Sequence, residues 1–147
     1  MSIPGLMIAE LDLEAMVAHC RRELPNEACG ILGGRNGRVE SVHPVENSPP
    51  SPTRYCMDPQ GQFRVLDALS RAGREVVGIY HSHPNGPAAP SRVDLEGALL
   101  AGTALPTYPG TVQVIVSLRD RAAPLVKGYA PDAGGGIEVP IVIRRQS

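Results

Sequence analysis

Aromatic residues are scarce in this sequence of 147 residues, which has no Trp, one Phe and four Tyr. Aliphatic side chains must therefore fill the interior, and stacking of aromatic side chains on nucleic-acid bases is not favoured. Basic clusters are also missing apart from Arg144 and Arg145, and acidic and basic residues nearly cancel to a net charge of −1. Without a broad cationic surface, nucleic acid is not an expected partner.

The sequence also lacks a targeting signal and a membrane-spanning run. Residues 1–10 include no basic residue, and Pro4 and Gly5 interrupt their apolar residues. No apolar run approaches the ~20 residues that a transmembrane helix needs. We therefore expect a cytoplasmic protein with no membrane partner. The length suits one hydrophobic core, so residues 1–147 are predicted to form a single domain.

Cysteine is limited to Cys20, Cys29 and Cys56, an odd number at wide spacing. This pattern fits neither a disulfide framework nor a Cys-x-x-Cys zinc site. We expect free, mostly buried thiols. The alternative is a reactive Cys29, because this thiol lies two residues from Glu27.

Helical and strand patterns are interleaved, which predicts a mixed sheet with helices packed on it, an α/β fold of the mixed α+β kind. Strands are expected at 6–9, 28–32, 38–45, 54–57, 76–80, 112–118, 125–129 and 137–143, the second and third joined by an Asn36-Gly37 hairpin turn. Helices are expected from an Asp12 cap to Pro25, from Asp58-Pro59 to about residue 72 with Phe63, Leu66 and Leu69 facing inward, and from Ser91 to about residue 101.

Three metal-binding side chains gather in the middle of the sequence. His81 and His83 follow the apolar strand 76–80, and residues two apart in extended backbone point to the same side. Asp94 comes eleven positions after His83, and the Pro-rich loop between them is long enough to bring its carboxylate back. Two nitrogens and one oxygen suit Zn²⁺, and three protein ligands leave a fourth position for water, as in catalytic zinc sites.

Two further residues supply what amide hydrolysis requires. Glu27 flanks an apolar strand and is our candidate for the acid/base that accepts the proton of water whose pKa the metal lowers toward ~7. Ser91 begins the helix that carries Asp94, so its hydroxyl and the N-terminal amides of that helix are placed to stabilise an oxyanion.

Each of these residues also has an ordinary explanation. His-x-His alone can be a polar strand end, Ser-x-x-Asp before an apolar helix is a capping box variant, and Glu27 alone can be a surface carboxylate. His19 and His43 have no partner at ligand spacing and are interpreted as ordinary surface or helix-face residues. It is the combination that favours a metal site.

The combination resembles the JAMM (MPN) metalloprotease family, whose pattern is a distant Glu, then His-Ser/Thr-His-Pro and, seven positions on, Ser-x-x-Asp. Glu27, His81-Ser82-His83-Pro84 and Ser91-Arg92-Val93-Asp94 supply every element. The resemblance implies a cytidine-deaminase-like fold, zinc ligands at His81, His83 and Asp94, Glu27 as general acid/base and Ser91 as oxyanion helper. It covers most of the chain, from the first helix through residue 118.

Residues 25–34 and 52–55 are similar to the stand-alone bacterial branch of that family. The resemblance implies a peptidase or isopeptidase acting on a small ubiquitin-like or sulfur-carrier protein with a C-terminal Gly-Gly tail; one type in this branch releases a cysteine from the carrier. Only about ten residues separate the Asp94 helix from the next strand, so the long insertions of eukaryotic deubiquitinases are missing. A homodimer is left open.

Three rival classes are set against this one. A non-catalytic MPN scaffold for partner proteins is the alternative function, although scaffolds of this family typically lack a ligand. A zinc deaminase would need His-x-Glu with Pro-Cys-x-x-Cys, and a zincin would need His-Glu-x-x-His. Neither set of motifs occurs in the sequence.

Overall fold

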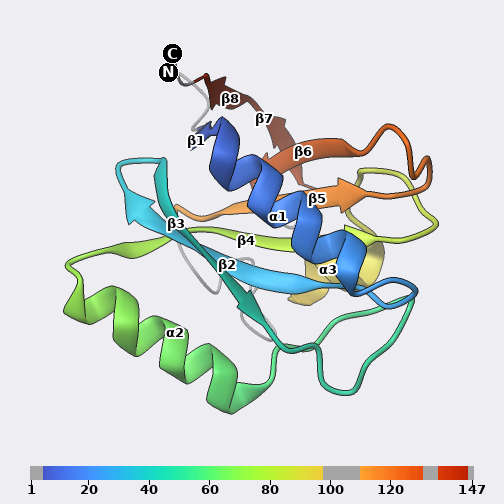
Figure 1. Ribbon diagram of the computed structural model, residues 1–147, viewed down its shortest axis with the longest axis horizontal. Helices are drawn as coiled ribbons and strands as arrows, with labels where there is room; N and C mark the ends of the chain where they lie inside the picture. The colour runs from blue at the N-terminus through green and yellow to red at the C-terminus, as the bar shows by residue number, and fades with distance from the viewer. Residues whose placement is uncertain (1–4, 98–109, 131–135, 146–147) are drawn as a thin grey trace.

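The computed structural model describes residues 5–97, 110–130 and 136–145. Within these residues eight strands alternate with three helices (Figure 1). In chain order they are β1 (Leu6–Ala9), α1 (Glu10–Arg22), β2 (Cys29–Arg35), β3 (Arg38–Val45), α2 (Pro59–Arg71), β4 (Glu75–His83), α3 (Arg92–Gly97), β5 (Val112–Ser117), β6 (Leu125–Ala130), β7 (Ile137–Val139) and β8 (Ile141–Arg144).

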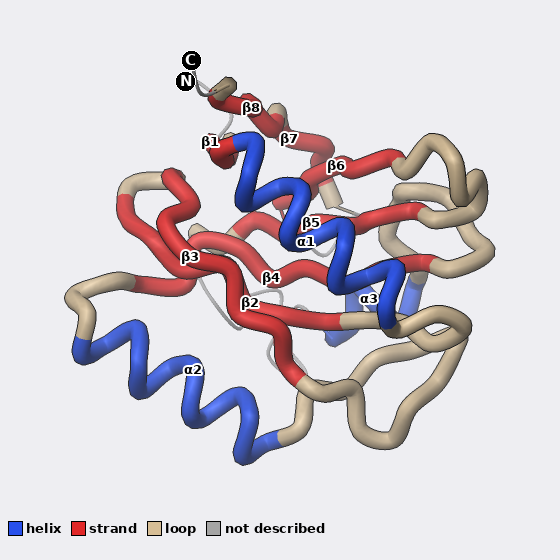
Figure 2. The backbone as a smooth tube through the Cα atoms, viewed as in Figure 1, coloured by secondary structure: helices blue, strands red, loops and turns tan. Residues whose placement is uncertain are grey.

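All described strands belong to one mixed sheet in the order β7-β6-β5-β4-β2-β3-β1-β8. The predicted mixed sheet with flanking helices is therefore confirmed. Central strand β4 pairs antiparallel with β2 and parallel with β5. The edge strands β7 and β8 are separated in the chain only by Pro140, so the sheet must curl until its two edges meet (Figure 2).

The hairpin of β2 and β3 follows the predicted turn chemistry. Asn36 and Gly37 both have positive φ, 52° and 73°. This is the backbone that a two-residue turn matching the twist of a hairpin requires, and Asn-Gly adopts it most readily. The strand β2 runs on through Gly33 and Gly34 instead of ending there. Position 34 requires glycine, because a side chain there would collide with the backbone of Arg38.

Helix α2 begins as predicted, but the side chains that it turns toward the sheet differ from the predicted ones. The Asp58 carboxylate accepts a hydrogen bond from the Gly61 amide at 2.9 Å, and Pro59 occupies the first turn. The prediction that Phe63 faces inward is wrong, since Phe63 is 68% exposed while Leu69 is 3% exposed. The buried stripe of α2 runs through Val65, Leu66 and Leu69, and Phe63 lies outside it.

Three other predictions fail locally. The expected strand 54–57 is only an isolated bridge between Asn47 and Met57. The expected strand 137–143 divides at Pro140, which lacks the amide that a continuous ladder needs. Asp12 does not cap α1; the helix begins at Glu10 with Ala9 as its N-cap, and Asp12 lies in the first turn. The part of the third expected helix beyond residue 97 lies outside the described residues.

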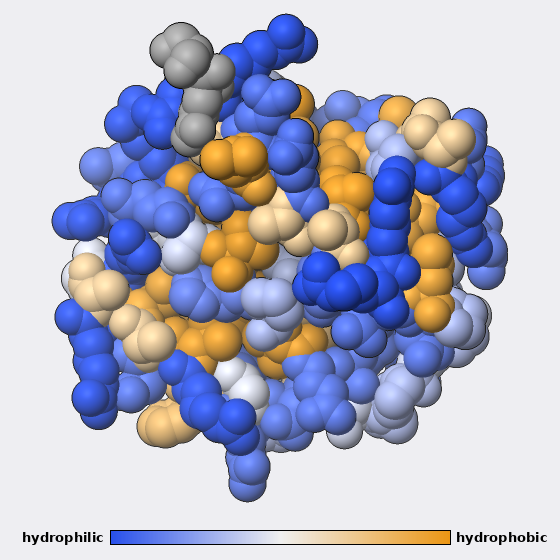
Figure 3. Space-filling view, in the orientation of Figure 1, coloured by the Kyte–Doolittle hydropathy of each residue, from blue (hydrophilic) through white to orange (hydrophobic). Residues whose placement is uncertain are grey.

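The helices divide between the two faces of the sheet. Met16 and Cys20 of α1 pack with Tyr80 of β4 in one core cluster. Leu69 of α2 packs with Ile79 in a second cluster, and side chains of neighbouring residues in a strand point to opposite faces. Hydrophilic residues cover most of the face that carries α1 (Figure 3). Among the described residues, no helix has both the length and the apolarity needed to cross a membrane.

Candidate metal centre

The centre forms at the carboxyl end of β4, where strand pairing fixes the backbone of both histidines. His81 pairs with Cys29 of β2, and His83 pairs with Ser117 of β5. The strand reaches His83, so the histidines lie within it and not after it as predicted. Ser82 points to the opposite face, where its hydroxyl accepts a hydrogen bond from the Ala28 amide at 2.8 Å. The side chain of Ser82 and those of the two histidines therefore point to opposite faces of the sheet, as the sequence predicts.

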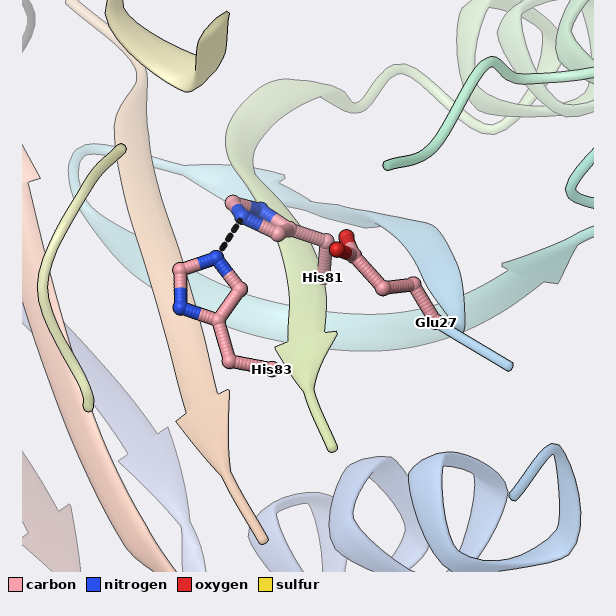
Figure 4. A group of neighbouring side chains, drawn as sticks. All are labelled: Glu27, His81 and His83. Atoms are coloured by element: carbon pink, nitrogen blue, oxygen red, sulfur yellow. Dashed lines mark hydrogen bonds between the residues drawn. The ribbon is translucent and has the colours of Figure 1, made fainter. Parts of the chain in front are cut away.

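Three ligand-type atoms converge at this end of β4. Nε2 of His81 lies 3.2 Å from Nε2 of His83 (Figure 4). Oδ2 of Asp94 lies 3.1 Å from the first nitrogen and 3.0 Å from the second. Tetrahedral zinc bonds of ~2.0–2.1 Å place two ligand atoms roughly 3.3 Å apart, so the spacing is close to that of a coordination shell.

The first turn of α3 holds the Asp94 carboxylate in this position. The Ser91 amide donates to Oδ2 of Asp94 at 2.8 Å, and the Asp94 amide donates to the Ser91 hydroxyl at 3.1 Å. This reciprocal pair is the capping arrangement that the sequence offers as the ordinary explanation. It also aims Asp94 at the histidines. A hydroxyl that accepts one hydrogen bond keeps its own proton to donate, so capping leaves Ser91 able to serve an oxyanion.

Glu27 enters the centre from the segment before β2. A carboxylate oxygen of Glu27 lies within 4.8 Å of a ring nitrogen of His81 and of a ring nitrogen of His83, and Figure 4 shows the carboxylate turned toward the two rings. Its Oε1 is buried with no hydrogen-bond partner among the described residues. The backbone is anchored, because the Glu27 amide donates to the Ser51 carbonyl at 2.8 Å and the Asn47 side chain donates to the Glu27 carbonyl at 3.1 Å.

The titration of these groups follows from burial and from their contacts. Burial raises the pKa of Glu27 to about 7, against a smaller opposing effect of His83. Burial alone would raise the pKa of Asp94, but hydrogen bonds with His81 and His83 outweigh it and hold that pKa well below its usual range. Burial also keeps the pKa of His81 below its ordinary value. An ionised Asp94 and a neutral His81 are the protonation states that bind metal.

The donor set suits a metal ion. Two imidazole nitrogens and a carboxylate oxygen face one another at 3.0–3.2 Å, and three such lone-pair groups are held together by a cation better than by the few protons available to them. The unpartnered Oε1 of Glu27 adds a polar atom beside them. Asp94 makes the shortest contacts with both histidines, and Glu27 lies adjacent to the three groups.

Tyr55 is a residue of the centre to which sequence reasoning assigned no role. Its ring stacks on the His81 ring with centroids 4.6 Å apart and an angle of 24° between the planes. Its only sequence signal is its place in segment 52–55, which resembles the bacterial branch of the JAMM family. Tyr55 forms a wall against the face of His81 and restricts the rotation of that ring.

The cysteines stand apart from this chemistry. Cys20 and Cys29 are buried and Cys56 is exposed, and all three are free thiols. The Cys29 thiol donates to the Val45 carbonyl at 3.4 Å, and burial raises its pKa to about 12. A thiol with so high a pKa holds its proton at neutral pH, which argues against the reactive Cys29 alternative.

The chain belongs to the family described as prokaryotic homologs of the JAB domain, which matches residues 11–126. The resemblance to the JAMM family is thereby confirmed. The chain is 38% identical over 144 residues to the CysO-cysteine peptidase of Mycobacterium tuberculosis (strain ATCC 25618 / H37Rv), a match that covers 96% of this chain and 93% of that protein. It is 33% identical over 124 residues to the desampylase of Haloferax volcanii, covering 80% and 84%.

A solved structure agrees with this assignment. The solution structure of a protein from Desulfitobacterium hafniense matches with a TM-score of 0.81 and 34% identity, covering 96% of this chain and 94% of that one. The fold, and not only the sequence pattern, is therefore shared along nearly the whole chain.

Proposed function

We propose that this protein is a zinc metallopeptidase that hydrolyses an amide bond at the C-terminal tail of a small ubiquitin-like or sulfur-carrier protein. The observation that carries the proposal is the convergence of two histidine nitrogens and one aspartate oxygen at 3.0–3.2 Å beside a buried, unpartnered glutamate oxygen. Similarity to a CysO-cysteine peptidase and to a desampylase supports the choice of substrate class. The Gly-Gly tail, a cytoplasmic location and a homodimer stay predictions.

In this proposal His81, His83 and Asp94 hold Zn²⁺, which when bound supplies Lewis-acid polarisation and lowers the pKa of water. Glu27 takes a proton from the attacking water and gives it to the leaving amine. Its pKa of about 7 suits both transfers, because a group that titrates near the working pH is readily deprotonated and reprotonated. The Ser91 hydroxyl donates to the oxygen that gains charge as the carbonyl is attacked.

The test separates metal binding from turnover. Protein purified without added metal is analysed for zinc before and after zinc is supplied. It is then incubated with a small carrier ending in Gly-Gly whose terminus is extended by one cysteine, by a peptide, or through a lysine side chain, and the products are weighed by mass spectrometry. We expect about one zinc per chain and cleavage directly after Gly-Gly.

A Glu27→Ala variant serves as the internal control. We expect it to retain its zinc content and its melting temperature while cleavage falls to background. Turnover in this variant at the parental rate would remove Glu27 from the mechanism. Zinc binding without cleavage of any extended carrier would contradict the peptidase and favour the non-catalytic scaffold.

A further inference from the structure

The loop between β4 and α3, residues 84–91, has no strand or helix of its own but supports the centre. Nδ1 of His83 lies 2.8 Å from the carbonyl oxygen of Pro87. A carbonyl oxygen only accepts hydrogen bonds, so Nδ1 carries a proton, and in the neutral ring Nε2 is left with the lone pair that a metal ion needs. The Pro87 carbonyl therefore selects the tautomer of His83 that can bind a metal.

The carbonyls on both sides of Pro87 are held by side chains from the neighbouring hairpin. The Ser117 hydroxyl, at the end of β5, donates to the Gly86 carbonyl at 2.6 Å. The Tyr129 hydroxyl, on β6, donates to the Ala88 carbonyl at 2.6 Å. Both donors are buried, with exposed fractions of 4% and 8%. The peptide groups around Pro87 are thus fixed from two strands at once.

His83 needs this support more than His81 does. The His81 side chain is 1% exposed and stacks on Tyr55, so packing alone restricts its ring. The His83 side chain is 11% exposed, and its backbone is anchored by the amide of Leu118, which donates to the His83 carbonyl at 3.0 Å. The ring itself is oriented by Pro87, whose position in an irregular loop depends on side-chain hydrogen bonds.

We propose that Ser117 and Tyr129 are positioning residues for His83, acting through the carbonyl of Pro87. Their hydrogen bonds to the Gly86 and Ala88 carbonyls hold the Pro87 carbonyl in position. There it orients the His83 ring and keeps the proton of that ring on Nδ1. The inference rests on the proposed function, because it takes His83 to be a metal ligand. The group that accepts the free N–H of a metal-ligating histidine is worth about 10–100-fold in metal affinity. Loss of the hydroxyls that hold this group in place should cost affinity toward the lower end of that range.

The test measures Zn²⁺ affinity by competition with a chromogenic chelator in the full-length chain. The variants are Ser117→Ala, Tyr129→Phe, the double variant, and Ser117→Thr, which restores the hydroxyl. Two controls remove comparable groups elsewhere. Thr111→Val deletes a hydroxyl that donates to the Val76 carbonyl at the other end of β5, and Tyr80→Phe deletes a buried hydroxyl bonded to His19 on the opposite face.

We expect zinc affinity to fall about 10-fold in each single variant and further in the double variant, with Ser117→Thr close to the parent and both controls within twofold. Nitrogen-15 spectra of metal-free protein, recorded at a pH where the His83 ring is neutral, should show the His83 proton on Nδ1 in the parent and distributed over both nitrogens in the double variant. Parental affinity in the double variant, or equal losses in the controls, would overturn the inference. Failure of the unaltered chain to bind zinc would instead overturn the proposed function and the inference with it.

Discussion

Histidines lie against both faces of β4, and their surroundings differ in what the ring nitrogens meet. On the face that carries α1, Nδ1 of His19 is hydrogen-bonded to the Tyr80 hydroxyl at 2.7 Å and Nε2 lies 3.6 Å from Glu23. On the opposite face, Nε2 of His81 and Nε2 of His83 approach each other and a carboxylate. A buried histidine whose nitrogens each have a partner is part of the packing. Histidines whose free nitrogens converge form a site.

The largest expected effect is on the site face. Asp94→Ala removes one of the three converging atoms, so we expect zinc content and hydrolysis both to fall to background. Zinc at 100 times its dissociation constant should stabilise the parent by about 2.7 kcal/mol and leave the variant unchanged. Thermal melting with and without zinc measures this difference. A variant that still gains stability from zinc would show that Asp94 is dispensable for metal binding.

The next effect separates two roles of Ser91. If its hydroxyl serves an oxyanion, Ser91→Ala should lower the catalytic constant by about 10²–10³-fold. If it is only a helix cap, the loss should be about 1 kcal/mol of stability with catalysis little changed. Asp58→Ala is the matched control, since it removes the cap of α2 away from the centre. Rates and urea unfolding are measured for both variants, and similar rates in the two would assign Ser91 to capping alone.

A smaller effect tests the packing of the α1 face. Gly30 lies against Tyr80, and a methyl group there would collide with the tyrosine ring and hydroxyl. We expect Gly30→Ala to destabilise the fold by about 1–3 kcal/mol, because a well-packed core cannot shift a ring without strain. Urea unfolding measures the loss. An unchanged urea midpoint would show that the core around Tyr80 is loosely packed, although this side chain is fully buried.

The smallest effect is a pH dependence from His19. Burial lowers its pKa in the folded state, with Glu23 opposing the shift. Unfolded His19 takes up a proton as the pH falls through about 6.5, and folded His19 does so only at lower pH. Its contribution therefore destabilises the native state below this pH, by at most about 1.4 kcal/mol per pH unit, and vanishes above it. A parent and a His19→Gln variant with identical stability profiles between pH 5 and 7 would contradict this.

The sequence predicts those features that depend on local chemistry. Alternation places His81 and His83 on one side of a strand, Asn36-Gly37 specifies a hairpin, and Asp58-Pro59 specifies a helix start. The approach of Asp94 follows less from spacing than from resemblance, because a loop of this length permits many positions for a carboxylate.

Features that depend on distant contacts were missed. Phe63 reads as a core residue from helical spacing, but the buried stripe of α2 is set by how that helix meets the sheet. Two sets of contacts join segments far apart in the chain: the stacking of Tyr55 on His81, and the hydrogen bonds from Ser117 and Tyr129 to the carbonyls of residues 86 and 88. A lone Ser or Tyr in a strand carries no signal of the carbonyl it will meet.

The pairing of β1 with β8 has a practical consequence for handling the molecule. Leu6 lies beside Ile141 in parallel register, so the two ends of the described chain leave from one place, at the top left of Figure 1, while α3 lies toward the other side. An affinity tag, a fluorescent reporter or a surface linker attached to either end would project from that corner. Attachment at both ends at once would crowd a single exit.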